Sequence, residues 1–316
     1  MEKIITVVGT TASGKSDLGI YLAQKFNGEI VSCDSRQVFK GLDLGTGKVT
    51  PEEQKLAVHH LIDIIEPNEK FSSAQFQKLA YKSINDILER KKTPFLVGGT
   101  GLYSRAVVEG FPFEEEEYNP KIREEVNALT KEQMLAELAA SGEIADEGLS
   151  PRHLARRVEK LRAGKKHTAE NKPLYEYIQL VCVYPREILN ARIEERLDKR
   201  LELGMVNEVR RLKECGATDE FLNGLGLEYR HTNAYLNGEK SFENYRDDLC
   251  LDIKHFAKRQ KTWFKKEKNA IWLDMTGDYR KQAEEICAAY LNGASADGII
   301  KKYSVKREDE KDGKTK

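Results

Sequence analysis

The chain has 316 residues, of which 40% are hydrophobic and 33% are charged, and its 52 Lys and Arg side chains balance 52 Asp and Glu. At roughly 150 residues per domain, this length predicts one large or two smaller domains. The composition excludes collagen-like and fully disordered chains. No apolar run approaches the roughly 18 residues of a membrane span, and the N-terminal apolar stretch is too short for a secretory signal. We therefore expect a cytoplasmic protein with no membrane partner.

Two hydrophobic patterns alternate along the chain. Apolar, β-branched runs predict strands, which we place at 4–9, 28–34, 93–99, 178–184 and 269–274. Apolar residues at helical spacing predict helices at 15–26, 72–91 and 101–110. Alternating strands and helices are typical of a parallel α/β sheet with right-handed crossovers. We predict a five-stranded parallel core.

The rhythm changes in the middle of the chain. Residues 116–172 show helical periods without a convincing strand, and Pro120 and Pro151 stand where two helices could begin. We therefore predict an α/β core and a helical insertion at 116–172; the core comprises 1–115 and 173–300. The remaining segment, 301–316, is polar and predicts a disordered tail.

Positive charge is concentrated in two stretches although the whole chain is neutral. Residues 150–172 hold eight Lys and Arg against two Glu, and residues 254–268 hold seven against one Glu. Such stretches are usually solvated helix faces, but two of them on one chain also fit a polyanionic partner.

The segment GTTASGKS, residues 9–16, fits the pattern G-x-x-x-x-G-K-[ST] between the first predicted strand and helix, which is the context of a P-loop. Its glycines let successive N–H groups face an anion at the positive end of a helix. Lys15 would neutralise phosphate charge, and Ser16 could hold Mg²⁺. The predicted phosphate-binding residues are Gly9, Thr10, Thr11, Ala12, Ser13, Gly14, Lys15 and Ser16.

The P-loop alone does not name a reaction. A nucleoside triphosphatase should carry a second strand ending in an acid that organises Mg²⁺. The strand at 93–99 ends in the sequence FLVGG, followed by threonine, and has no acid there. This argues against a motor or a GTPase and leaves small-substrate kinases and other diphosphate-binding enzymes. Asp34 follows the second strand at the predicted ligand edge, where a carboxylate can accept a proton from a nucleophile. A turn or helix cap is the competing interpretation of Asp34.

Several segments together closely resemble the tRNA dimethylallyltransferases, the tRNA isopentenyltransferase family. In chain order they are GTTASGKS, CDSRQVFKGLDLGTGK, HHLIDIIEP, FLVGGTGLYSRAVVEG, ARRVEKLRAGK, ARIEERLDKRLELGMVNEVRRL and AKRQKTWFKK. The resemblance covers about residues 1–275. It implies transfer of the dimethylallyl group from dimethylallyl diphosphate to N6 of adenosine 37 in tRNA. It also implies Mg²⁺, a P-loop that holds diphosphate, extrusion of the target base and a helical insertion that binds the anticodon stem-loop. We expect a monomer.

The same resemblance implies roles for individual residues. Asp34 is the catalytic acid–base, Thr11 is the catalytic P-loop threonine, and Arg196 is the arginine beside the diphosphate, with Arg192 as the second choice. The implied tRNA contacts are Asp34, Ser35, Arg36, Gln37, Thr100, Arg123, Arg152, His153, Arg156 and Arg157.

This chain departs from the family pattern at four positions: Thr10 replaces a proline, Phe39 a tyrosine, His153 an arginine and Glu228 a glycine. We expect Trp263 and Phe264 to pack in the core, with base stacking as the alternative. Three other functions remain open: an adenylate isopentenyltransferase, a P-loop small-molecule kinase and a non-catalytic RNA-binding module. The helical insertion favours tRNA over a free nucleotide, and the P-loop with Asp34 argues against a purely binding role.

Overall fold

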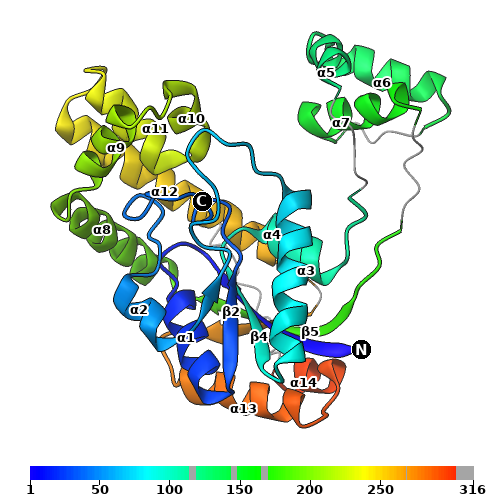
Figure 1. Ribbon diagram of the computed structural model, residues 1–316, viewed down its shortest axis with the longest axis vertical. Coiled ribbons are helices and arrows are strands. Elements are labelled where there is room, and N and C mark those ends of the chain that lie inside the picture. The colour runs from blue at the N-terminus through cyan, green and yellow to red at the C-terminus, as the bar shows by residue number, and fades with distance from the viewer. Residues whose placement is uncertain (114–118, 144–147, 165–169, 268, 304–316) are drawn as a thin grey trace, which may run out of the picture. The chain divides into compact units, whose positions relative to one another are not determined.

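A computed structural model describes residues 1–113, 119–143, 148–164, 170–267 and 269–303 of the chain. The chain divides into two compact units. The larger unit combines Met1–Gly110 with Pro173–Lys316 and contains the sheet, whereas Phe111–Lys172 forms the smaller, helical unit (Figure 1).

The larger unit is built on a parallel sheet. In the described residues the sheet has six strands in the order β3-β2-β4-β1-β5-β6, and every neighbouring pair is parallel. The strands are β1 Glu2–Gly9, β2 Gly28–Ser32, β3 His59–His60, β4 Thr93–Gly98, β5 Tyr175–Val183 and β6 Ala270–Asp274. The central β1 pairs on both sides, with Val7 opposite Val97 on β4 and Leu180 on β5.

The prediction of a five-stranded core is wrong by one edge strand. The five predicted strands are all present, but β3 was not predicted. It has two residues, His59 and His60, which pair with Ile30 and Val31 of β2. A strand this short has no alternation of apolar and polar residues, so the sequence pattern carries no signal for it.

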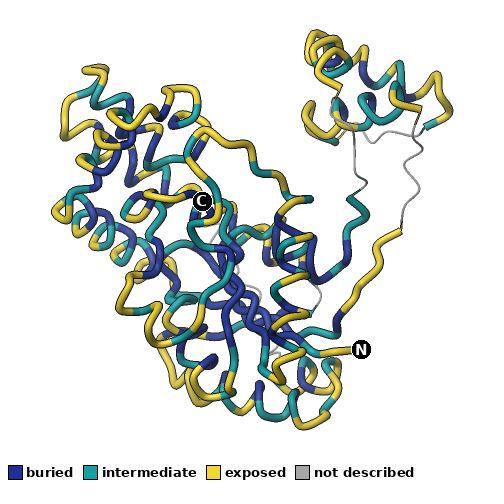
Figure 2. The backbone as a smooth tube through the Cα atoms, in the orientation of Figure 1, coloured by how far each residue is buried: buried dark blue, intermediate teal, exposed yellow. Residues whose placement is uncertain are grey.

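Helices cover both faces of the sheet, and the strands lie in its buried centre (Figure 2). On one face, α1 (Lys15–Lys25) and α13 (Tyr279–Leu291) pack on the strands. On the opposite face, α3 (Ser73–Glu89) and α4 (Gly101–Val108) bury a second apolar cluster. The α4 helix ends two residues before the predicted end at residue 110.

A group of helices follows β5. They are α8 Arg186–Glu202, α9 Met205–Glu214, α10 Asp219–Leu225, α11 Leu227–Leu236 and α12 Phe242–Phe264. On α8, Leu189, Ile193 and Leu197 are spaced four residues apart and are all buried against α12. This spacing sets the rotation of α8 and places its arginines beside the P-loop.

The described part of the C-terminal segment corrects one boundary. Helix α14 (Ala296–Tyr303) extends into the segment that was predicted as a disordered tail, and it buries Ile299 against the core. The rest of that tail, 304–316, lies outside the described residues. Another short helix, α2 (Pro51–Leu56), begins at a capping box formed by Thr50. No described helix is long and apolar enough to cross a membrane.

The smaller unit has a core of its own. Its described helices are α5 Pro120–Asn127, α6 Lys131–Ala140 and α7 Pro151–Arg162. Pro120 and Pro151 occupy the first helical position, where a missing N–H costs nothing. The three helices bury an apolar cluster that includes Val126, Leu138 and Leu154.

Candidate active site

The P-loop, residues 9–16, connects β1 to α1 at the carboxyl edge of the sheet. A Cβ atom on Gly9 would lie 2.7 Å from the carbonyl oxygen of Cys182, so β5 leaves room only for glycine. Ala12 and Gly14 have φ angles of 59° and 79°, in the left-handed region. This conformation is strained for Ala12, and strained backbone is frequent where a loop must face a ligand.

Polar groups of the P-loop are arranged for an anion. The buried hydroxyls of Thr10 and Ser13 have no hydrogen-bond partner among the described residues. Lys15 Nζ donates to the carbonyl oxygen of Thr10 at 3.3 Å. Burial, reinforced by the neighbouring cation of Arg196, lowers the pKa of Lys15 to about 8. A phosphate group would give these donors acceptors and would favour the charged form of Lys15.

Two of the α8 arginines contact the P-loop in different ways. Arg196 donates from Nη1 to Thr11 Oγ1 and from Nη2 to the carbonyl oxygen of Gly47, both at 3.3 Å. Arg192 donates from Nε to the carbonyl oxygen of Ala12 at 2.9 Å and so stabilises the backbone of this strained residue. The structure therefore brings Arg196 together with Thr11, the pair that the resemblance singled out, and gives Arg192 a backbone-supporting contact.

Asp34 follows β2, with Cys33 between them, and is half-buried. Its Oδ1 accepts the backbone N–H of Arg36 at 2.9 Å, so one carboxylate oxygen shapes a turn. The adjacent Ser35 N–H donates to Thr100 Oγ1 at 3.1 Å, which ties this turn to the loop after β4. The charge of Asp34 acts on Lys15 and favours its protonated form. Asp34, Ser35 and Thr100 thus come together at the P-loop edge of the sheet.

The sequence reasoning missed the role of Gln260 on α12. This side chain is buried, its Oε1 accepts the N–H of Thr11 and its Nε2 donates to the carbonyl oxygen of Gly99, both at 2.9 Å. Gln260 therefore joins the P-loop to the loop after β4. The segment AKRQKTWFKK, which contains Gln260, is part of the family resemblance, but nothing in its periodicity distinguishes this glutamine from a solvated one.

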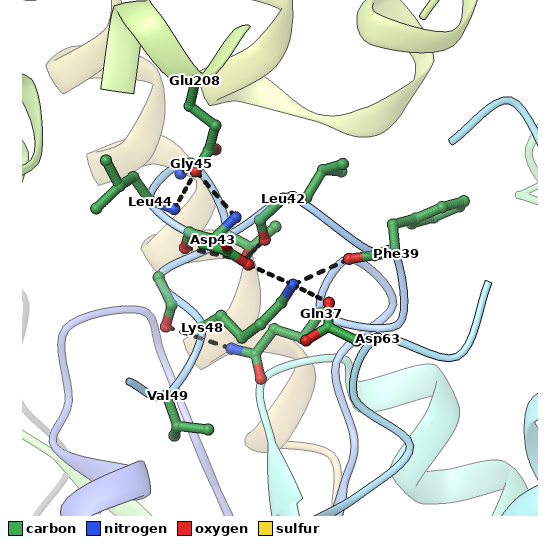
Figure 3. Close-up of polar contacts among 12 residues, drawn as sticks. Gln37, Phe39, Leu42, Asp43, Leu44, Gly45, Lys48, Val49, Asp63 and Glu208 are labelled. Atoms are coloured by element: carbon green, nitrogen blue, oxygen red, sulfur yellow. Dashed lines mark hydrogen bonds and ion pairs between the residues drawn. The ribbon is translucent and has the colours of Figure 1, made fainter. Parts of the chain in front are cut away.

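The segment 42–48, called here the GTGK loop, is held by one buried carboxylate (Figure 3). Glu208 on α9 accepts the backbone N–H groups of Asp43, Leu44 and Gly45 at 3.0, 2.6 and 3.0 Å. It also accepts the hydroxyl of Tyr229 at 2.8 Å. Four donors on one carboxylate fix the backbone of the GTGK loop beside α8.

Lys48 and Gln37 secure the other side of the GTGK loop (Figure 3). The buried ammonium of Lys48 donates to Asp43 Oδ1 at 2.6 Å and to a carboxylate oxygen of Asp63. Gln37, also buried, donates to the carbonyl oxygen of Gly47 at 3.4 Å, the acceptor that Arg196 also uses. Gln37 was predicted as a tRNA contact, and in this structure its amide lies within the polar network behind the site.

The predicted tRNA-binding arginines of the helical unit form ion pairs. Arg123 binds both carboxylate oxygens of Glu159, at 2.9 and 3.2 Å, and Arg156 contacts the same group at 2.8 Å. Arg157 pairs with Glu143 at 2.8 Å.

The remaining predicted contacts lie at the start of α7 and after β2. Arg152 is exposed, and His153 is held by the Ser150 hydroxyl, which lies 2.7 Å from its Nδ1. Arg36, predicted next to Asp34, is half-buried.

The structure shows the surroundings of two departures from the family pattern and of the two aromatic residues predicted to lie in the core. Glu228 forms an ion pair with Arg200 at 3.4 Å, and Phe39 is buried edge-to-face on Phe221. Phe264 is buried as predicted, but the prediction for Trp263 is wrong, because its side chain is 37% exposed. Trp263 and Phe264 are adjacent on α12, so their side chains point in different directions. The indole of Trp263 lies against the backbone of Gly101, next to Thr100, where a Cβ atom would lie 2.3 Å from the ring.

The comparisons with known proteins agree with this geometry. A parallel sheet with a P-loop after its central strand defines a P-loop NTPase-like fold. A family model described as IPP transferase matches residues 37–267. This chain therefore belongs to the IPP transferase family.

Curated relatives and solved structures extend over nearly the whole chain. A tRNA dimethylallyltransferase of Lachnoclostridium phytofermentans is 38% identical, covering 90% of this chain and 95% of the relative. A tRNA dimethylallyltransferase 2 of Shewanella sediminis is 41% identical, over 90% and 97%. The crystal structure of a full-length tRNA isopentenylpyrophosphate transferase from Bacillus halodurans has a TM-score of 0.71 at 33% identity, over 95% and 99%. A eukaryotic dimethylallyltransferase acting on tRNA shares the fold, with a TM-score of 0.79 at 24% identity, over 92% and 80%.

Proposed function

We propose that this chain transfers the dimethylallyl group from dimethylallyl diphosphate to N6 of adenosine 37 in tRNA and releases diphosphate. The observation that carries the proposal is the P-loop of an IPP transferase family member, in which Arg196 contacts Thr11 and the charge of Asp34 acts on Lys15. This arrangement has cations for a leaving diphosphate and a carboxylate for a nucleophile on the same edge of the sheet.

The chemistry divides between these groups. The adenine amine is a weak nucleophile, and Asp34 can accept one of its hydrogens while N6 attacks the allylic carbon and the carbon–oxygen bond to diphosphate breaks. Lys15, Arg196 and the hydroxyl of Thr11 would stabilise the charge that develops on the leaving oxygens. Most of the rate acceleration would therefore come from positioning and from leaving-group electrostatics.

We propose Mg²⁺ as the cofactor, held by Ser16. Among the described residues no group of three or more His, Cys, Asp or Glu is placed to hold a metal ion. A single hydroxyl ligand still fits Mg²⁺, because this ion usually keeps several waters and binds substrate phosphates. When bound, it would neutralise part of the diphosphate charge.

We propose that the helical unit binds the anticodon stem-loop and that the chain acts as a cytoplasmic monomer. Supporting the first point, α7 carries both Arg152 and Arg156 on its exposed surface. Trp263 in the larger unit also supports an RNA substrate, because its partly exposed indole next to Thr100 offers a surface on which a base can stack.

Mass spectrometry of tRNA nucleosides tests this function. The full chain is incubated with tRNA, dimethylallyl diphosphate and Mg²⁺, without ATP, and we expect N6-isopentenyladenosine among the nucleosides, with oligonucleotide fragments of the same tRNA placing it at position 37. AMP replaces tRNA in a parallel reaction. Equal prenylation of AMP would favour an adenylate isopentenyltransferase, and phosphoryl transfer from ATP would favour a kinase.

A further inference from the structure

Arg200, one helical turn after Arg196 on α8, is a buried cation with few partners. Its side chain is 9% exposed. Its Nη1 reaches the carbonyl oxygen of Gly45 and Glu228 Oε1, both at 3.4 Å, the outer limit of a hydrogen bond. Its Nε and Nη2 make no hydrogen bond with any described residue. A buried guanidinium has five N–H donors, so most of its bonding capacity is unused.

Arg200 and Arg196 converge on the same point. A Cβ on Gly47 would lie 2.0 Å from Arg200 Nη2 and 2.2 Å from Arg196 Nη2, so the two groups are neighbours across the GTGK loop. Both arginines line a small cavity against the P-loop, together with Thr11 and Ala12. Two like charges side by side and largely shielded from water are unfavourable unless an anion lies between or beside them.

The surrounding charges point the same way. Burial and the charge of Arg200 lower the pKa of Arg196 to about 10, and Arg200 also contributes to the lowered pKa of Lys15. Glu228 is the carboxylate within ion-pair distance of Arg200 in the described residues, and its side chain is 22% exposed. Lys15 of the P-loop therefore lies near two further cations, Arg196 and Arg200, and the ion pair between Arg200 and Glu228 is long and partly solvated.

We infer that Arg200 is a second diphosphate-binding arginine beside Arg196, and that Glu228 is a provisional counter-ion which the diphosphate group replaces. This inference rests on the proposed function. It gives Glu228, a departure from the family pattern, a specific partner. The GTGK loop, fixed by Glu208 and Lys48, would hold both guanidinium groups in position without an ordering cost when diphosphate binds.

The competing interpretation is a purely structural ion pair that joins α8 to α11. The two interpretations differ in the sign of one effect. If Arg200 binds diphosphate, removing Glu228 frees the guanidinium and strengthens binding. If the pair is structural, removing either partner loosens the same contact, and diphosphate binding weakens in both variants or changes in neither.

Calorimetric titration of inorganic diphosphate into the full chain with Mg²⁺ decides between them. For Arg200→Gln we expect a roughly 10- to 100-fold weaker Kd, the range for a lost hydrogen-bonded charge, with a smaller loss for inorganic monophosphate. For Glu228→Gln we expect a Kd tighter than that of the wild type by a few-fold. The matched control is Arg246→Gln on α12, which breaks an ion pair to Asp198 of α8, the helix that carries Arg200, and should leave Kd unchanged.

Each outcome has a defined consequence. A folded Arg200→Gln that binds diphosphate within two-fold of wild type would overturn the inference. So would a Glu228→Gln variant that binds more weakly or equally, and this second variant decides the matter if Arg200→Gln does not fold. If the wild type neither binds diphosphate nor prenylates tRNA, the proposed function fails; if it does both and only the variants disagree, this inference alone fails.

Discussion

Arginines of the helical unit and Arg196 of the core have different acceptors: carboxylates in the helical unit, and a hydroxyl and a carbonyl oxygen at Arg196. In the helical unit, Arg162 binds both oxygens of Glu137 at 2.6 and 2.7 Å, and Arg157 pairs with Glu143 at 2.8 Å, in solvent-accessible positions. In the core, Arg196 has hydroxyl and carbonyl acceptors at 3.3 Å and no carboxylate within ion-pair distance among the described residues. The uncompensated charge therefore lies in the core, beside the P-loop.

This contrast suits two different anions. A buried cation without a carboxylate is positioned for a small, highly charged ligand that enters a dry site. A solvated ion pair contributes only about 0.2–1 kcal/mol, so an RNA phosphate can replace the carboxylate at little cost. We therefore propose that the buried cations of the core bind diphosphate tightly, and that the solvated arginines of the helical unit exchange carboxylate partners for RNA phosphates.

The largest expected effect comes from Asp34, whose charge acts on both Lys15 and Arg196. Asp34→Ala should lower the rate of prenyl transfer by roughly 10²–10⁴, the range for a positioned proton acceptor. Binding of diphosphate should change little, because the P-loop and Arg196 remain. Single-turnover kinetics and calorimetry measure the two quantities separately.

The matched control is Asp34→Asn. An amide oxygen still accepts the N–H of Arg36 and preserves the turn, but an amide does not take a proton from adenine N6. If Asp34→Asn transferred the prenyl group at the wild-type rate, Asp34 would be a turn residue, and the core cations would have no catalytic carboxylate beside them.

The difference between the two regions also marks what the sequence could predict. The strand–loop–helix context of residues 9–16 and the apolar stripe of α8 are local features, and the structure confirms both. The positive excess at 150–172 was counted along the chain, whereas the carboxylates that pair with it come partly from other segments: Glu125 and Glu137 from α5 and α6 meet Arg162. A count of charges within one stretch leaves out the carboxylates that folding brings to it from other segments.

The missed features are long-range for the same reason. Gln260 contacts Thr11 across 249 positions, and Glu208 contacts Leu44 across 164. The edge strand β3 depends on pairing with β2 and not on its own two residues. No local periodicity encodes such contacts, and only the folded chain shows that the P-loop and the GTGK loop share one polar network.

A second prediction tests whether the core cations need a rigid frame. Gln260→Ala would leave the Thr11 N–H and the Gly99 carbonyl without partners in a buried position, and each unsatisfied group costs about 1–3 kcal/mol. We expect a lower free energy of unfolding by a few kcal/mol and roughly ten-fold weaker diphosphate binding. Chemical denaturation and calorimetry report these. Gln54→Ala, which removes a single contact to Val49 away from the P-loop, is the control and should change neither.

A third prediction concerns the helical unit. Affinity for tRNA should fall steeply with salt, with a log–log slope of about −0.7 to −0.9 per phosphate contact. Reversal of Arg156 and Arg157 to Glu should weaken tRNA binding and flatten this slope. It would also disturb their ion pairs with Glu159 and Glu143, so unfolding must be measured in parallel.

Arg152→Glu is the sharper variant, because Arg152 is exposed at the first turn of α7. We expect a several-fold loss of tRNA affinity and a slope reduced by about one contact, with diphosphate binding unchanged. Unchanged tRNA affinity and slope in both variants would mean that this face of α7 is only solvated, and the proposed RNA surface would have to lie elsewhere.

The smallest expected effect is a pH dependence confined to the core. Lys15 has a pKa of about 8 in the folded chain against about 10.5 for an exposed lysine. Between these values the unfolded chain binds more protons, so the contribution of Lys15 to stability rises with pH from about 8 to about 10.5, and below pH 8 its buried charge is a constant cost. Bound diphosphate requires the charged form, so diphosphate affinity should instead fall as the pH rises through 8.

Calorimetry between pH 7 and 9 measures this loss, which should be a few-fold because Lys15 is only one of the cations at the site. Diphosphate itself and the buffer also titrate, so the comparison is made with Lys15→Arg, whose side chain keeps its charge throughout this range. The variant should bind with a flatter pH profile than the wild type, while tRNA binding by the solvated arginines of the helical unit should have the same profile in both proteins. Identical diphosphate profiles for the two proteins would show that Lys15 stays charged, and the core would then be no more shielded from water than the surface of the helical unit.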